Sequence, residues 1–174
     1  MARNSFVRSL AQKLAGFALL FVTLAFVFAL ILGAVAYVEP VIVQYMVTGS
    51  GDLSFLTAAE AAHMSDVAGV IRSGMFFALA TLLYLILYAQ WRAIDKALVR
   101  DALIMNLVFI LLLVPFQYTF TWFHKAFFPQ GNWQFPADSW LITHFSEQFF
   151  FVVALCWVLG TALVLVLLLR TSAK

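Results

Sequence analysis

The stretch L-A-G-F-A-L-L-F-V-T-L-A-F-V-F-A-L-I-L-G-A-V-A-Y-V, residues Leu14 to Val38, decides the class of fold because it contains no charged residue. About 20 apolar residues suffice for a helix to cross the hydrocarbon core of a bilayer. Three more apolar runs follow, roughly Gly69 to Ala89, Ala102 to Thr121 and Phe149 to Leu169. A helix satisfies its own backbone hydrogen bonds in lipid. We therefore expect an all-α membrane protein, a four-transmembrane-helix bundle that forms one integral membrane domain over residues 1–174.

The composition supports lipid as the solvent of this chain. Hydrophobic residues make up 65% of it and charged residues 10%, against about 45–50% and about 25% in a soluble domain. A net charge of +2 argues against nucleic acid as a partner. The single cysteine, Cys156, excludes a disulfide framework, a relay of CxxC pairs and a zinc site built from thiolates.

The basic residues predict the orientation in the membrane. Cytoplasmic loops carry an excess of lysine and arginine. Eight of the ten basic residues fall before the first run, between the second and third, or after the fourth: Arg3, Arg8, Lys13, Arg92, Lys96, Arg100, Arg170 and Lys174. Both termini should therefore be cytoplasmic, and all three histidines should lie on the outer side. The first apolar run exceeds the 7–15 residues typical of a signal peptide, so we expect an uncleaved first helix.

The segment before the second span carries a histidine between two acids. Thr57 and Glu60 have the spacing of a capping box, which predicts a short outer helix that begins near Ala58 and continues into the span. Glu60, His63 and Asp66 then share one helix face. Neighbouring carboxylates orient an imidazole and raise its basicity, as a general base requires. The alternative is a solvated helix end whose acids favour the helix dipole.

Arg72 lies about one turn inside the second span. Ionisable residues at such positions are candidates for function, and Arg72 is a candidate substrate-binding residue. The alternative is an arginine that extends its side chain to lipid phosphate.

The segment between the third and fourth spans is an aromatic-rich outer loop. It contains His124 and Asp138 among many rings, of which Phe127, Phe128 and Trp133 are candidate substrate-binding residues. The breaks at Pro129, Gly131 and Pro136 predict a path that folds Asp138 back towards His124. Part of this aromatic density is typical of membrane anchoring. The same composition suits a groove that holds acyl chains beside a polar centre.

The two outer segments together resemble the bacterial lipoprotein intramolecular transacylase family of four-span membrane proteins. The resemblance rests first on a T-x-x-E-x-x-H-M-x-D-V stretch before the second span. It rests also on the order of a Phe-His pair, a Phe pair, W-x-F and two acids after the third span. The matching residues are Thr57, Glu60, His63, Met64, Asp66, Val67, Phe123, His124, Phe127, Phe128, Trp133, Phe135, Asp138, Glu147, Phe149 and Phe150.

The resemblance implies an enzyme of the bacterial cytoplasmic (inner) membrane with its active site on the outer face. Its substrates would be diacylglyceryl-modified lipoproteins, whose sn-2 acyl chain moves to the α-amine of their own N-terminal cysteine. His63 and His124 would be catalytic, with Glu60, Asp66 and Asp138 as supporting residues. Ester-to-amide exchange is downhill, so we expect neither a metal nor another cofactor.

Two other functions remain open from the sequence. His63 and His124 could be the axial ligands of a haem, although the CxxCH attachment motif is absent from the sequence. The chain could also be a non-catalytic binding or assembly protein, in which both histidines would be replaceable. A transporter is disfavoured because the spans carry few polar residues.

Overall fold

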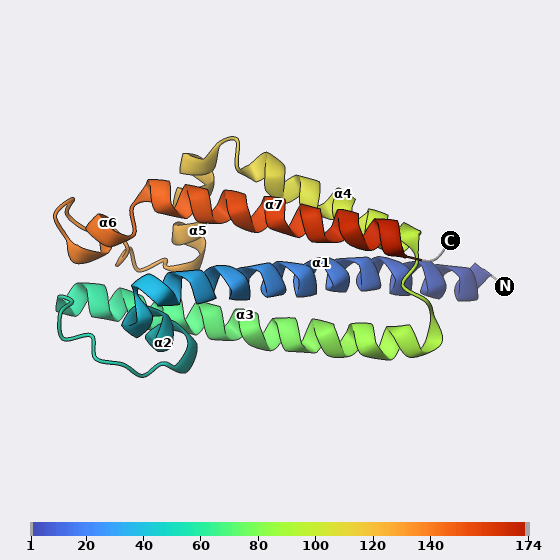
Figure 1. Cartoon of the computed structure of the whole chain (residues 1–174), viewed down its shortest axis with the longest axis horizontal. Coiled ribbons are helices and arrows are strands. Elements are labelled where there is room, and N and C mark those ends of the chain that lie inside the picture. Colours follow the sequence, from blue (N-terminus) through green and yellow to red (C-terminus); the bar gives the residue numbers. More distant parts are fainter. Residues whose placement is uncertain (1, 173–174) are drawn as a thin grey trace. The chain divides into compact units, whose positions relative to one another are not determined.

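The computed structural model describes residues 2–172, which are mostly helical and contain no strand (Figure 1). The predicted orientation in the membrane remains a prediction. Of the basic residues that it uses, Lys174 lies outside the described residues, as do the side chains of Arg3 and Arg8. The helices are α1 (Ala2–Val38), α2 (Pro40–Thr48), α3 (Ala58–Trp91), α4 (Lys96–Leu112), α5 (Phe116–Phe127), α6 (Trp140–His144) and α7 (Glu147–Thr171).

Three of these helices, α1, α3 and α7, are long and apolar enough to cross a membrane. The third predicted span, 102–121, is not a single straight helix. The chain leaves α4 at Leu112 and enters α5 after a bend of 101°. Pro115 stands at this bend, where it lacks an amide donor and its ring would clash with a continuing helix. The count reaches four spans if the bent pair is taken as one.

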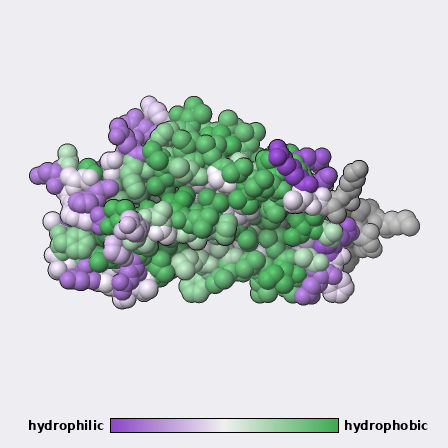
Figure 2. Space-filling model, in the orientation of Figure 1, coloured by the Kyte–Doolittle hydropathy of each residue, from purple (hydrophilic) through white to green (hydrophobic). Residues whose placement is uncertain are grey.

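The surface of the described chain is that of a lipid-solvated protein. Apolar residues cover much of the face in Figure 2. Large hydrophobic side chains on the spans are exposed, among them Phe76 at 74% and Leu163 at 60%. A soluble protein rarely leaves so much contiguous apolar surface to water, so these side chains are suited to lipid.

The chain divides into two compact units, and α1, α3 and α7 contribute residues to both. The first unit comprises 2–28, 76–111 and 156–172. Its core is made of apolar residues from α1, α3, α4 and α7: Ala15, Ala18, Leu19, Leu20, Leu24, Leu85, Leu98, Val99, Ala102 and Leu165. Small residues on α1 allow close approach to α4, since a side chain on Gly16 would lie 3.3 Å from Cβ of Asp101.

Three hydrogen bonds connect helices inside the first unit. The indole of Trp157 donates to the carbonyl oxygen of Leu24 at 2.7 Å, and the hydroxyl of Tyr84 donates to that of Ala11 at 3.0 Å. The buried side chain of Asn106 donates to the carbonyl oxygen of Val158 at 3.2 Å. Such hydrogen bonds determine how the helices are placed against one another, because the apolar contacts around them are not directional.

The second unit comprises 29–75 and 112–155 and contains all three histidines. Its core brings α2, the start of α3, and α6 together through Ile42, Leu56, Met64, Leu141 and Phe145. The predicted capping box is present, because α3 begins at Ala58 and the carboxylate of Glu60 accepts the amide proton of Thr57 at 2.9 Å. Met64 points into this core, which fixes the rotation of α3 and hence the direction of its neighbour His63.

Candidate active site

The structure brings two histidines together from separate helices of the second unit. His63 belongs to the outer part of α3 and His124 to the last turn of α5. Their ring centroids lie 6.3 Å apart with the planes inclined by 27°. Both side chains are buried, with 8% and 9% of their surface exposed. Two imidazoles at this separation are close enough to act on the same small reacting group.

The tautomer of neutral His124 follows from its backbone contact. Nδ1 of His124 lies 2.8 Å from the carbonyl oxygen of Phe120. A carbonyl can only accept, so Nδ1 carries the proton and the lone pair of the neutral ring is on Nε2. The helix itself provides this contact, since Phe120 precedes His124 by four residues on α5. His124 is therefore arranged to accept a proton at Nε2.

Aromatic rings enclose the two imidazoles. Phe128 contacts both, with centroid distances of 4.8 Å to His63 and 5.6 Å to His124. Trp133 lies 4.9 Å from His124, and Phe135 lies 5.6 Å from His63. An apolar enclosure favours the neutral form of an imidazole, which is the form that accepts protons.

The other aromatic candidate from the sequence, Phe127, is 51% exposed and stacks on Phe123 at 4.6 Å. Two contacts at the histidine pair did not emerge from sequence reasoning as site residues. These are Phe135 and Phe120, whose ring lies 4.1 Å from His124. The sequence did contain a signal for Phe120: it precedes His124 by four residues, the spacing of neighbours on one helix face.

Asp66 connects α3 to the segment that follows α5. Its Oδ2 accepts from the side-chain amides of Gln130 at 2.7 Å and Asn132 at 2.6 Å. The sequence predicted that Asp66 would orient His63 directly, but Nδ1 of His63 is buried without a hydrogen-bond partner. Gln130 and Asn132 were missed. The sequence signal for them was their position on either side of Gly131, in a predicted turn with polar side chains.

Glu60 does not orient His63 as the sequence suggested. Its Oε2 accepts from the backbone amide and the hydroxyl of Thr57 at 2.9 and 2.8 Å, and its Oε1 accepts from the amide of Leu141 at 3.0 Å. The capping box turns the side chain back towards the start of α3, away from the next turn. Only 2% of Glu60 is exposed. This buried carboxylate therefore joins the start of α3 to the start of α6.

Two further predicted site residues, Asp138 and Arg72, form no hydrogen bond with the histidine pair within the described residues. Asp138 is exposed, and Nδ1 of His124 contacts the carbonyl oxygen of Phe120, so the predicted contact of Asp138 with His124 is not observed. Nε of Arg72 donates to the carbonyl oxygen of Ala68 at 3.1 Å. The Arg72 guanidinium lies over Gly49, which ends α2 with a φ of 74°. Arg72 thus contacts the end of α2, where a cation interacts favourably with the negative end of the helix dipole.

The third histidine, His144, contacts residues of its own helix rather than the other two histidines. It is exposed at the end of α6, and its ring stacks on Trp140 at 4.0 Å. Its Nδ1 lies 2.9 Å from the carbonyl oxygen of Trp140.

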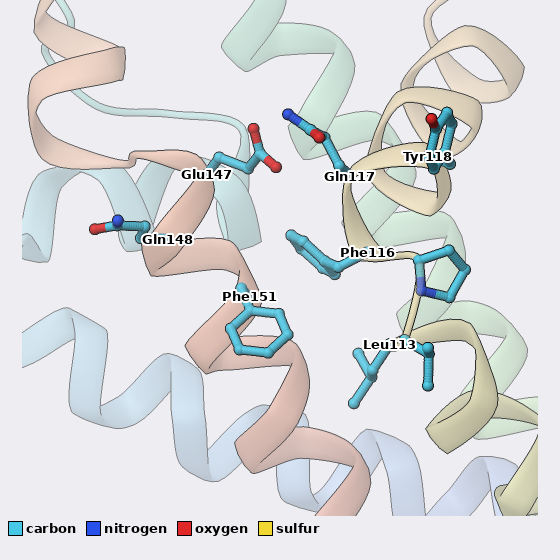
Figure 3. A pocket seen from close by; sticks show the side chains of 9 residues that line it. Leu113, Phe116, Gln117, Tyr118, Glu147, Gln148 and Phe151 are labelled. Atoms are coloured by element: carbon cyan, nitrogen blue, oxygen red, sulfur yellow. The ribbon is translucent and has the colours of Figure 1, made fainter.

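A groove of about 790 Å³ opens beside the bend between α4 and α5 (Figure 3). It is lined by Leu113, Val114, Pro115, Phe116, Gln117, Tyr118, Glu147, Gln148 and Phe151. Neither His63 nor His124 lines it, so the groove and the histidine pair are separate features of the second unit. Within the described residues, no group of three or more His, Cys, Asp or Glu side chains is arranged to hold a metal ion.

The role of Glu60 gives a test of stability. Glu60→Gln places an amide group where the carboxylate now accepts three hydrogen bonds, so one N–H of Thr57 or Leu141 loses its acceptor. We expect the free energy of unfolding to fall by about 1–3 kcal/mol, the cost of leaving a buried polar group without a hydrogen bond. Thermal unfolding in detergent measures it, with the exposed Asp138→Asn as the matched control. Equal melting temperatures for Glu60→Gln and the parent would show that this carboxylate does not hold the two helix starts.

The part of the chain that contains both histidines matches a known protein family. The family model of the lipoprotein intramolecular transacylase Lit matches residues 33–150, which include both histidines. The chain is also similar to the in meso structure of the membrane-integral lipoprotein intramolecular transacylase Lit from Bacillus cereus. That similarity has a TM-score of 0.75 at 17% identity and covers 95% of each chain, so it shows a shared fold. No curated protein matches the chain.

Proposed function

Because the chain belongs to the lipoprotein intramolecular transacylase family, we propose that it moves the sn-2 acyl chain of a diacylglyceryl lipoprotein to the α-amine of the same lipoprotein's N-terminal cysteine. The product is a lyso-form lipoprotein with an amide-linked chain. The observation that carries this proposal is the buried pair His63 and His124, with ring centroids 6.3 Å apart inside an aromatic enclosure. The pair supplies the proton transfers that the reaction needs.

The reaction begins with a protonated amine. An α-amine has a pKa of about 8, so at neutral pH most of it is an ammonium that cannot attack an ester. His63 takes one proton from this ammonium at Nε2. The free amine then attacks the sn-2 carbonyl carbon. A C–N bond forms and the C–O bond to glycerol breaks.

The second histidine completes the proton balance. Nε2 of His124 takes the second proton from the attacking nitrogen, and protonated His63 returns its proton to the departing glyceryl oxygen. The products are an amide, a free glyceryl hydroxyl and one proton, which leaves from His124 to solvent. The Nδ1 contact of His124 to Phe120 supports this assignment, because it keeps the Nε2 lone pair free.

The intramolecular nature of the reaction reduces what the enzyme has to supply. Amine and ester belong to one molecule, and well-oriented intramolecular steps reach effective molarities of about 10⁵ M or more. The aromatic rings at the pair serve to hold the acyl ester and to exclude water, which would otherwise hydrolyse it. Protons are exchanged only among the substrate, the two histidines and solvent, so no cofactor takes part in this scheme.

The location follows from the same proposal. Diacylglyceryl lipoproteins carry their modified cysteine at the outer face of the bacterial cytoplasmic membrane, where membrane lipid surrounds the acyl chains. We place both termini in the cytoplasm, in line with the excess of basic residues near the chain ends and between the second and third spans.

The two histidines are tested by replacement. We expect His63→Ala and His124→Ala each to slow conversion of a diacylglyceryl lipopeptide to its N-acyl lyso form by roughly 10²- to 10⁴-fold, because each removes one proton-transfer group. Mass spectrometry of the lipopeptide measures the conversion. His144→Ala is the matched control, since His144 is exposed and stacked on Trp140. Near-normal conversion by both site variants would remove the catalytic role of the two histidines. No conversion by the parent would favour a binding or assembly role, and a Soret band in the purified protein would favour haem.

The path of the acyl chain is tested with a substrate whose amine is blocked. Direct attack by the amine predicts that an N-acetylated lipopeptide keeps its sn-2 ester, because its nitrogen is no longer nucleophilic. A covalent relay through a histidine would instead acylate the enzyme and release a lyso-glyceryl product. Intact-mass measurement of enzyme and lipopeptide separates these outcomes. An acyl-sized increase on His63 or His124 would contradict direct attack.

A further inference from the structure

We infer that Asn132 is a positioning residue for His63, linking its Nδ1 to the carboxylate of Asp66. In this arrangement the side-chain oxygen of Asn132 accepts the Nδ1 proton of His63, while its amide group donates to Asp66. The inference rests on the proposed function for its kinetic consequence. Its structural content concerns one tautomer and can be measured without a substrate.

The orientation of Asn132 is determined by Asp66. An ionised carboxylate is only an acceptor, so the group 2.6 Å from its Oδ2 has to be the NH₂ of Asn132 rather than its oxygen. Oδ1 of Asn132 must then point away from Asp66. This oxygen is buried and has no hydrogen-bond partner. It is an acceptor in need of a donor.

His63 has the complementary deficiency. Its Nδ1 is also buried without a partner, although the ring lies among Phe128, Phe135 and His124. His63 precedes Asp66 by three residues on α3, and Asn132 donates to Asp66 at 2.6 Å, so the two unpaired atoms belong to side chains at the same turn of α3. Buried polar atoms are rarely left unpaired. A hydrogen bond between these two atoms satisfies both at once.

The pairing determines which nitrogen of His63 is available for chemistry. With the proton held on Nδ1, the lone pair of the neutral ring is on Nε2, the atom that the proposed reaction uses. When Nε2 takes a proton, the charge on the ring is stabilised by the oxygen of Asn132, whose amide is in turn polarised by Asp66. Asp66 thus acts on His63 through one intervening amide.

Gln130 provides an internal control for this inference. It donates to the same oxygen of Asp66 at 2.7 Å, but its side chain is exposed. Gln130→Leu and Asn132→Leu each remove one hydrogen bond between the loop and α3. Only Asn132→Leu also removes the acceptor for His63.

The structural part is tested by ¹⁵N NMR of the protein labelled at histidine, in detergent and at a pH where the rings are neutral. His63→Ala identifies the His63 signals. We expect the parent and Gln130→Leu to show the Nδ1–H tautomer of His63, and Asn132→Leu to show a mixture with Nε2–H. Asp66→Asn, which lets the Asn132 amide rotate, should give a similar mixture and replaces Asn132→Leu if that variant does not fold. An unchanged His63 tautomer in the folded Asn132 or Asp66 variant would overturn the inference.

The kinetic part uses the same variants on the diacylglyceryl lipopeptide. We expect Asn132→Leu to lower kcat by roughly 10- to 100-fold, the range for groups that orient a functional histidine, with KM changed less than about twofold. Gln130→Leu should change both by less than about twofold. Equal losses in the two variants would reduce Asn132 to a loop anchor and overturn its positioning role. If the parent shows no transfer at all, the proposed function fails, while the NMR comparison still decides whether Asn132 sets the tautomer.

Discussion

A single carboxylate oxygen, Oδ2 of Asp66, holds the aromatic loop against α3 by accepting hydrogen bonds from Gln130 and Asn132. The loop carries Phe128, Trp133 and Phe135, the rings that enclose the histidine pair. Hydrogen bonds to a charged acceptor are stronger than those between neutral groups. They add to the backbone hydrogen bond from Phe128 to the carbonyl oxygen of His124 at 2.8 Å, which holds the start of the same segment. Asp66 thus connects the segment that encloses the site to α3.

The second acid of the same helix face has a different task. Glu60 joins the first turn of α3 to the first turn of α6 and is nearly inaccessible to solvent. Glu60 thus determines where α3 begins. Asp66, less than two turns later, holds the aromatic loop against the same helix. His63 lies between them and forms its polar contacts with neither acid directly. Both acids therefore position the histidine through the backbone and the loop rather than through a bond to its ring.

The helix start at Ala58 and the shared face of Glu60, His63 and Asp66 could be predicted from the sequence, because capping and helical periodicity are local. The partners of the two acids could not be predicted. Leu141 is 81 residues from Glu60, and Gln130 and Asn132 are 64 and 66 residues from Asp66. Nothing local indicates which distant amide will occupy a carboxylate oxygen. The bend after α4 had a local signal in Pro115, but the continuous apolar pattern of 102–121 concealed it.

The central claim is that His63 and His124 act as one catalytic unit, and a double-mutant cycle tests it most directly. Conversion of the diacylglyceryl lipopeptide is measured by mass spectrometry for the parent, His63→Ala, His124→Ala and the double variant. Groups that act together in one step lose nearly all their effect when either is removed. The account predicts that the double variant is no slower than the slower single variant. Losses that multiply in the double variant would contradict it, because the two imidazoles would then act independently.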